Sequence, residues 1–410
     1  MRDRVPARGR APAWLPRVAR LSLLFLLLLL QAGCQTSGNE TEMQTRRLGI
    51  SDNEILIGAS LALTGHAGYL GSETLHGAMA YIEHINAAGG IHGRKLTVIA
   101  YDDGYDPPRC LYNTQKLLTE DQVFALFCYV GTPTTVKILP LVAEAKIPLV
   151  GMFTGANALR DPLQPYVINV RASYYQETGA AVRHLVADLG LKRIGVFYQY
   201  DAYGFDGLRG TELALKSYGL VPVATGTYIR GTSDVTEGLA RIQAARAEAV
   251  VMIGTYEPCA RFIQSARATG YAPIFHNLSF VGAEALIKRL GKAAEGVVIT
   301  QVVPPPEQAP LAPELWGIQE YIDLLRRYYP EDAPNFVSLE GYLNARVLVE
   351  GLRRAGRNLD REGFLKAIES IQELDLGVAS PLSFSARDHQ GLERVYLTYV
   401  QNGSFQWLQE

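Results

Sequence analysis

The chain has 410 residues, of which 48% are hydrophobic and 20% charged, and its formal net charge is −2. This balance excludes a strongly basic nucleic-acid binder and a polar disordered chain. At roughly 150 residues per domain, the length predicts two to three compact units, each with its own core.

The N-terminus resembles an export signal. Six arginines between Arg2 and Arg20 precede a ten-residue apolar run from Leu21 to Leu30, and the pair Ala32-Gly33 follows it. A basic start, a short apolar segment and a small-residue exit are the parts of a secretory signal, and the run is too short to span a bilayer. We therefore predict a signal peptide over residues 1–33, with a short membrane anchor as the alternative.

Cys34 follows a small-residue box that resembles the cleavage site of bacterial lipoproteins, in which this cysteine is acylated and becomes the first mature residue. Gln31 stands where that box usually has Leu. Residues 34–52 are polar and without periodicity, as in a flexible tether. We predict a periplasmic or other extracytoplasmic location, with a lipid on Cys34 anchoring the chain to a bacterial membrane.

Three further cysteines are Cys110, Cys128 and Cys259. An oxidising compartment would permit a disulfide, and Cys110 and Cys128 are close in sequence, where a helix begins and the next strand ends. A Cys110–Cys128 bridge and three buried thiols remain the two alternatives. No C-x-x-C or paired Cys/His spacing is present, so we expect no metal site.

Short apolar runs alternate with longer amphipathic stretches from Glu54 onward. Residues 55–63 are typical of a strand, and residues 72–90 predict a helix with Leu75, Met79 and Ile82 on one face. Further strands are predicted over 95–103, 123–130 and 147–153, with helices over 109–120 and 133–145 between them. Strands that are apolar throughout are buried on both faces, which indicates a parallel sheet covered by helices.

A second series of alternating strands and helices begins after Arg171. Its predicted strands cover 193–200, 221–228, 249–256 and 296–303, and its predicted helices cover 177–190 and 257–270, with two more starting at Tyr203 and Asp234. Late helices are predicted over 316–327, 338–354 and 361–371, and two strand-like segments near the end are joined by the turn QNGS. The fold class is therefore α/β, with two doubly wound parallel-sheet lobes.

Residues with binding chemistry follow the predicted strands of the first lobe. Thr132 and Thr134 follow one strand, and Phe153, Thr154 and Gly155 follow the next. Because open α/β sheets bind ligands at the carboxyl ends of their strands, backbone N–H and threonine hydroxyl groups there could hold a carboxylate. Simple helix capping is the alternative for each turn alone.

Tyrosines follow the strands of the second lobe in the same way. Tyr198, Tyr200, Asp201 and Tyr203 follow one strand, and Tyr256 with Glu257 follows another. A tyrosine at a strand end can stack on a small ligand and donate a hydrogen bond to it. The alternative is that these tyrosines are ordinary surface or core residues that bind no ligand. This alternative has more weight for Tyr198 and Tyr200 than for Tyr203 and Tyr256.

Motifs of enzymes and nucleotide sites are absent from the sequence. The first turn, TGHAGYLGSE, has the spacing G-x-x-G-x-x-G, which matches neither a dinucleotide fingerprint nor a Walker A loop. No G-x-S-x-G or H-E-x-x-H motif is present. A hydrolase using Asp102 or Glu73 was the remaining enzymatic alternative. We predict a protein that is not an enzyme and that needs no cofactor.

Several ordered motifs together carry a resemblance to a known family. INAAGGIHGRKLTVIAYDDGYDP, the turns YVGTPT and FTGA, the segment DAYG and the late EGYLNARVLVEGLRRAG resemble the solute-binding proteins of ABC transporters of the leucine/isoleucine/valine-binding type. The resemblance runs from Glu54 to Trp407. It implies a type I periplasmic-binding fold, with two lobes joined by three crossover strands and the ligand trapped between them.

The resemblance also implies domain boundaries and partners. Lobe 1 would comprise residues 53–170 plus 304–376, and lobe 2 residues 171–303 plus 377–410, with crossovers near Arg171, Val303 and Gly377. The implied protein is a monomer and not an enzyme. Its implied partners are a small-molecule ligand, the membrane subunits of an ABC permease and, through the lipid, the membrane, with no nucleic acid.

Carried over to this sequence, the family's first-lobe contacts fall on Thr132, Thr134, Phe153, Thr154 and Gly155, and its second-lobe contacts on Tyr203 and Tyr256. Amino-acid-binding relatives add an acidic residue for the ligand ammonium within the segment that here reads HNLSFVGAE. This chain has Asn277 and Ser279 near that point and only Glu284 further along.

An uncompensated buried ammonium is costly. Either Asp201 or Glu257 replaces the missing acid, or the ligand lacks an ammonium group. We therefore expect capture of a branched-chain or aliphatic amino acid, an amide or an aromatic carboxylate by hinge closure, for delivery to an ABC importer. The alternative is a ligand-sensing periplasmic module that signals to a separate receptor.

Overall fold

The structure is a computed structural model that describes residues 48–306 and 312–408. The predicted signal peptide, Cys34 and most of the tether lie outside the described residues. Within residues 48–306 and 312–408, no helix combines the length and apolar character that a membrane crossing requires.

The first sheet has five parallel strands in the order β2-β1-β3-β4-β5. The strands are β1 (Glu54–Leu61), β2 (Lys95–Asp102), β3 (Ala125–Phe127), β4 (Leu149–Val150) and β5 (Val167–Ile168). β3 and β4 are shorter than the apolar runs around them. Cys128 (φ 53°) and Gly151 (φ 65°) adopt left-handed backbone conformations directly after these strands, so each ladder ends there.

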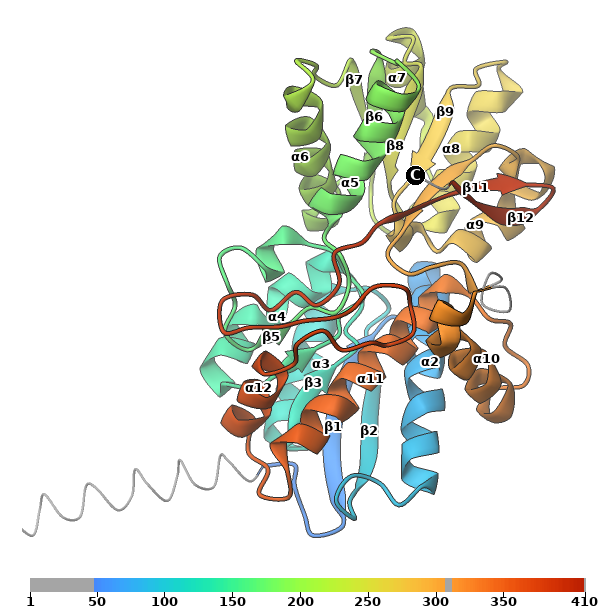
Figure 1. Ribbon diagram of the computed structural model, residues 1–410. Coiled ribbons are helices and arrows are strands. Elements are labelled where there is room, and N and C mark those ends of the chain that lie inside the picture. Colours follow the sequence, from blue (N-terminus) through green and yellow to red (C-terminus); the bar gives the residue numbers. More distant parts are fainter. Residues whose placement is uncertain (1–47, 307–311, 409–410) are drawn as a thin grey trace, which may run out of the picture. The chain divides into compact units, whose positions relative to one another are not determined.

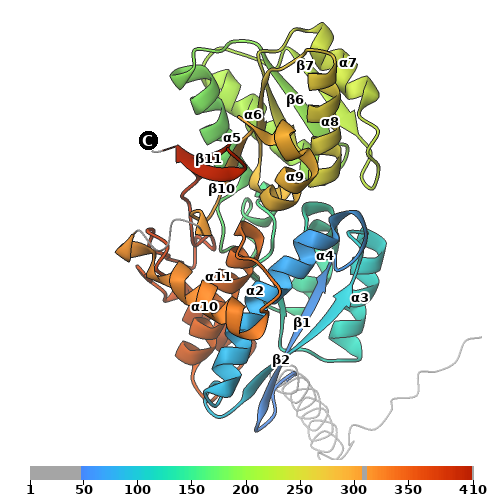
Figure 2. The ribbon, with the colours of Figure 1, turned by 90° about the vertical axis from the view of Figure 1, so that its right-hand side faces the viewer.

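Six helices pack with this sheet: α2 (Gly68–Ala87), α3 (Pro107–Thr119), α4 (Thr132–Ala145), α10 (Trp316–Tyr328), α11 (Phe336–Ala355) and α12 (Arg361–Glu369). α2 and α11 lie side by side in both Figure 1 and Figure 2. A Cβ on Gly77 would lie 1.8 Å from the carbonyl oxygen of Ser338, so the two helix backbones touch. The late helices predicted after residue 312 therefore complete the first lobe.

The second sheet has seven strands in the order β12-β11-β10-β9-β8-β6-β7. Its parallel strands are β6 (Ile194–Gln199), β7 (Ala224–Tyr228), β8 (Ala249–Ile253), β9 (Ile274–Asn277) and β10 (Val298–Gln301). β11 (Tyr396–Gln401) and β12 (Ser404–Leu408) add an antiparallel hairpin. Its turn residues Asn402 and Gly403 both have positive φ, as a two-residue hairpin turn favours.

The helices of the second lobe are α5 (Tyr174–Val182), α6 (Ala202–Ser217), α7 (Thr236–Ala244), α8 (Tyr256–Ala268) and α9 (Ala283–Leu290), labelled in Figure 1. The predicted α/β class with two parallel-sheet lobes is confirmed. β5, β9 and α9 are elements that the sequence pattern did not indicate, because each is too short to show a clear period.

The lobe boundaries stay a prediction, with one adjustment. The chain passes from β5 to α5 through Arg171, as expected. Gly317 donates its N–H to the carbonyl oxygen of Gly377 over 3.1 Å, so Gly377 packs on α10 of the first lobe. Leu392 donates to the carbonyl oxygen of Val170 over 2.8 Å. We therefore move the proposed third crossing from Gly377 to the neighbourhood of Leu392.

In the structure, Cys110, Cys128 and Cys259 are free, buried thiols. Of the two alternatives, three buried thiols are therefore present and the Cys110–Cys128 bridge is not. The hydroxyl of Tyr129 lies 2.9 Å from that of Thr114 on α3, the helix that also carries Cys110. The Cys128 sulfur instead lies 3.8 Å from the Nδ2 of Asn344, on α11, so the two cysteines lie against different helices.

Candidate functional site

Two threonine hydroxyls meet where β3 and β4 end. The Oγ1 atoms of Thr132 and Thr154 lie 2.7 Å apart, and both side chains are buried. The N-cap of α4 is Gly131, at φ 95°, so the helix begins at Thr132, one residue before the predicted start. Thr134 points back to its own chain, because its hydroxyl donates to the carbonyl oxygens of Val130 and Gly131 at 2.6 and 2.9 Å.

Gly155 brings the first residue of α5 onto this strand end. Its carbonyl oxygen accepts a 2.7 Å hydrogen bond from the N–H of Tyr174. A Cβ on Gly155 would lie 2.7 Å from both the nitrogen and the Cδ1 of Tyr174. Only glycine allows this approach, and it sets the Tyr174 ring beside the threonine pair.

Phe280, in the short helix η4 (Ser279–Val281), is surrounded by aromatic rings from both lobes. Its ring centroid lies 5.5 Å from that of Phe153, 4.7 Å from Tyr203 and 5.9 Å from Tyr105. The rings of Tyr174 and Tyr203 are 5.1 Å apart. The structure thus joins the predicted residues Phe153 and Tyr203 through Phe280 and Tyr174, two residues that sequence reasoning did not select.

Tyr256 contacts a different part of the first lobe. Its ring packs edge-on against Tyr69 of α2 at 6.1 Å, and the guanidinium of Arg289 lies 4.2 Å above it. No ring contact joins Tyr256 to Phe280 or Tyr203 in the described residues. Of the two predicted second-lobe contacts, therefore, only Tyr203 lies in the aromatic cluster.

The hydroxyls of Tyr174 and Tyr203 are buried and have no hydrogen-bond partner among the described residues. Burial raises the pKa of both phenols above the usual value, so both stay protonated and able to donate. We call Thr132, Thr154, Tyr174 and Tyr203 the hydroxyl cluster. Because an unsatisfied buried polar group is costly, these hydroxyls mark a place for an acceptor from outside the chain.

The two candidate ammonium partners are already engaged. Glu257 is half-exposed and paired with Arg289. Asp201 caps α6 by accepting from the N–H of Tyr203 at 3.1 Å, and it also accepts from Gln199 Nε2 at 2.7 Å.

Glu284, the acid in the HNLSFVGAE segment, is bonded elsewhere. It accepts from the N–H of Phe336 at 2.8 Å and from the Tyr69 hydroxyl at 3.2 Å. Burial raises its pKa to about 7. Asn277, in the same segment, is buried with both polar atoms of its amide unpartnered in the described part of the chain.

The carboxylates considered for hydrolysis have structural partners. Asp102 accepts from the N–H groups of Leu63 and Gly104, each at 2.9 Å, and so closes the turn after β1. Glu73 accepts from Asn335 Nδ2 at 2.6 Å.

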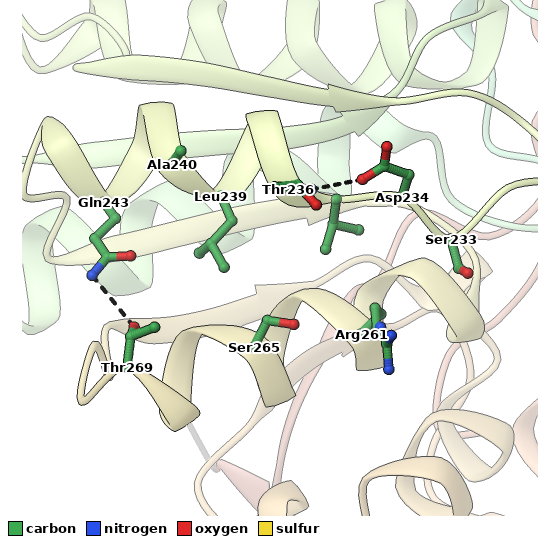
Figure 3. A pocket seen from close by; sticks show the side chains of 10 residues that line it. Ser233, Asp234, Thr236, Leu239, Ala240, Gln243, Arg261, Ser265 and Thr269 are labelled. Carbon is green, nitrogen blue, oxygen red and sulfur yellow. Dashed lines mark hydrogen bonds between the residues drawn. The ribbon is translucent and has the colours of Figure 1, made fainter.

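A separate groove of about 550 Å³ lies between α7 and α8, and Figure 3 shows its lining. Two of its polar side chains bond locally, since Asp234 accepts from the N–H of Thr236 and Gln243 donates to Thr269. None of the buried unpartnered side-chain atoms of the described residues belongs to its lining. Because it lacks such a buried unpartnered group, this groove is a weaker candidate than the hydroxyl cluster.

The chain is similar to known proteins over most of its length. A family model described as periplasmic binding protein matches residues 54–404. Leu/Ile/Val-binding protein homolog 7 of Brucella abortus is 23% identical over 338 residues, which cover 78% of this chain and 81% of that protein.

Two solved structures are similar over most of the chain. A possible leucine/isoleucine/valine-binding protein from Rhodopirellula baltica is 39% identical, with a TM-score of 0.82, over 87% of this chain and 96% of that one. A substrate-binding periplasmic protein from Ralstonia solanacearum is 30% identical, with a TM-score of 0.80, over 87% of this chain and 100% of that one. The chain belongs to the periplasmic binding proteins, as a type I member of the Leu/Ile/Val-binding family.

Proposed function

We propose that this chain captures one small organic solute between its two lobes by hinge closure and delivers it to an ABC importer. Members of its family are extracytoplasmic solute-binding proteins. The observation that carries the proposal is the hydroxyl cluster, because two threonine hydroxyls of one lobe and two unpartnered phenols of the other converge beside Phe280. A carboxylate or amide oxygen would satisfy these donors.

The proposed solute lacks an ammonium group. The aromatic rings of Phe280, Phe153 and Tyr105 surround the cluster, and the nearby acids Asp201, Glu257 and Glu284 are committed to other partners. A cationic amine placed here would be desolvated without a free carboxylate. Carboxylates and amides with an aliphatic or aromatic body therefore fit better than α-amino acids.

A thermal-shift panel of amino acids, amides and carboxylates tests capture. A specific solute at 100 times its dissociation constant adds about 2.7 kcal/mol to the free energy of unfolding, and so raises the Tm. A broad panel that leaves the Tm unchanged would contradict the proposal.

Thr154→Val then tests the site. Removing this hydroxyl leaves one acceptor of the solute unsatisfied, so we expect the affinity for the solute to fall about 5- to 20-fold. The buried Thr132 hydroxyl also loses its partner, so the free energy of unfolding should fall by about 1 kcal/mol. Thr119→Val is the matched control, because the Thr119 hydroxyl is exposed and donates to the carbonyl oxygen of Gln115 in its own helix. Equal affinities for Thr154→Val and the wild type would refute the cluster as the site.

We also propose that residues 1–33 are a signal peptide and that acylated Cys34 holds the mature chain on a membrane. The basic, apolar and small-residue segments in this order support the proposal. Labelled palmitate should enter the wild-type chain and not the Cys34→Ser variant.

A further inference from the structure

Two more polar atoms that have no hydrogen-bond partner among the described residues lie near Tyr105. They are Nε2 of His66, in the turn after β1, and Nη1 of Arg230, in the loop after β7. The His66 ring centroid is 5.6 Å from that of Tyr105, and the Arg230 guanidinium is also 5.6 Å from it. We call these two residues the His66–Arg230 pair. One member comes from each lobe.

Tyr105 is held firmly in place. Its N–H donates to Asp103 Oδ1 at 2.8 Å, and its hydroxyl accepts from Gln199 Nε2 at 3.2 Å. A Cβ on Gly131 would lie 2.1 Å from the ring, so the strand end packs directly on it. The Phe280 ring lies 5.9 Å from the Tyr105 ring and 4.7 Å from the Tyr203 ring, so Tyr105 lies near both groups of unpartnered atoms.

The His66–Arg230 pair offers donors and a positive charge. The nearest acid to Arg230, Asp201, lies 3.7 Å from its Nε, and it is already hydrogen-bonded by Gln199 and by the N–H of Tyr203. Burial and the neighbouring Arg230 lower the pKa of His66, which favours the neutral imidazole with one N–H to donate. Arg230 therefore has an N–H free for an acceptor and favours an anionic one, and His66 can donate to the same acceptor when its proton is on Nε2.

We propose that the His66–Arg230 pair binds a second carboxylate of the solute, so that the chain selects dicarboxylates with a short aliphatic or aromatic body. The first carboxylate binds the hydroxyl cluster and the body lies against Tyr105 and Phe280. This inference rests on the proposed capture function and narrows its substrate class.

Calorimetric titration of two matched pairs of probes tests the selection: adipate against hexanoate, and terephthalate against 4-methylbenzoate. Within a pair, only the second carboxylate differs. We expect the wild type to bind the dicarboxylate of at least one pair 10-fold or more tightly. Arg230→Gln should abolish that preference while leaving the affinity for the monocarboxylate within about twofold, because a charge-assisted hydrogen bond is lost at one end only.

Two further variants separate binding from folding. His66→Ala should reduce the preference in the same direction, since it removes the partner donor from the other lobe. Arg209→Gln is the matched control, because Arg209 is an exposed arginine of α6 that pairs with Glu212 of the same helix. Its preference should equal that of the wild type, and circular dichroism of all variants checks that each is folded.

Unchanged preference in Arg230→Gln, or tighter binding of the monocarboxylates by the wild type, would overturn the second carboxylate site. A wild type that binds amides or amino acids but neither dicarboxylate would overturn it as well and leave capture standing. If no solute of any class binds, the proposed function itself fails, and this inference fails with it.

Discussion

At the scale of single residues, the site depends on a few buried groups whose surroundings decide their chemistry. Gly155 permits the contact with Tyr174, and the same tyrosine keeps a protonated hydroxyl because it is buried. His276 on β9 is an unusual case outside the site. It is fully buried, neither ring nitrogen has a partner among the described residues, and its ring lies 6.2 Å from that of His184.

His276 should make the fold sensitive to acid. Burial, with a smaller contribution from His184, lowers its pKa to about 3. In the unfolded chain the imidazole has a pKa of about 6.5. Between that pH and about 3, the unfolded chain therefore binds a proton at His276 and the folded chain does not. The contribution of His276 to stability is therefore lost as the pH falls from about 6.5 toward 3, by up to about 1.4 kcal/mol per pH unit.

The substitution His276→Phe keeps a flat ring and removes this titration. Urea unfolding at pH 7, 6 and 5 should show a shallower loss of unfolding free energy in the variant than in the wild type. His84→Phe, at a partly exposed position of α2, serves as the control. Parallel curves for His276→Phe and the wild type would show that the buried imidazole does not carry the effect.

At the scale of elements, Arg171 connects α5 and α11. It lies at the proposed first crossing of the chain between the lobes. Its Nη2 donates to Glu177 Oε1 of α5 at 2.7 Å, and its Nη1 lies 3.2 Å from Glu340 Oε2 of α11. Glu177 also accepts from the N–H of Ser279 and from the Thr300 hydroxyl at 2.8 and 2.7 Å. The guanidinium of Arg171 is thus the counter-ion of two buried carboxylates, one from each lobe.

Removing the guanidinium should be strongly destabilising. Arg171→Met leaves two buried carboxylates without a counter-ion, and the expected loss in unfolding free energy is about 3 kcal/mol or more. Burial already raises the pKa of Glu340 to about 7, against the opposing effect of Arg171. Glu340→Gln in the Arg171→Met background should therefore recover part of the loss.

Denaturant unfolding of the two single variants and the double variant gives the coupling energy between Arg171 and Glu340. Arg326→Met, at an exposed arginine of α10, is the control and should stay within about 0.5 kcal/mol of the wild type. Additive effects of Arg171→Met and Glu340→Gln would contradict a direct ionic link.

At the scale of the whole molecule, specific side-chain contacts join the two lobes. Besides Arg171 and the rings around Phe280, Gln199 donates to the Tyr105 hydroxyl, and the N–H of Asn157 donates to Asp206 at 3.1 Å. Such small polar contacts can break and re-form when a hinge opens, and a solute that touches both lobes stabilises the closed form by its differential affinity.

Small-angle scattering checks this hinge model. Adding a solute that raises the Tm should lower the radius of gyration, and the Thr154→Val variant should need a higher concentration of the solute for the same change. Superimposable scattering curves with and without a bound solute would mean that capture occurs without closure.

Much of the fold could be predicted from local pattern. The apolar runs that became β1, β2, β6 and β8 and the helices α10, α11 and α12 follow periodicity that side-chain burial imposes. The same logic failed for β5, β9 and α9, which are short. The third crossing stays a prediction, because residues 377–390 have little pattern and take their place from contacts with α10 and β5.

The sequence by itself determined the class of the protein and the strand ends at which Thr132, Thr154 and Tyr203 lie, because these depend on order along the chain. Only the tertiary structure decided that Phe280 and Tyr174 pack with Tyr203, and that His66 and Arg230 lie beside Tyr105. It also decided that Tyr256 and Thr134 contact other residues, and that Cys110 and Cys128 form no bridge. Those outcomes depend on which residues meet across two sheets, and that information is absent from any local stretch of sequence.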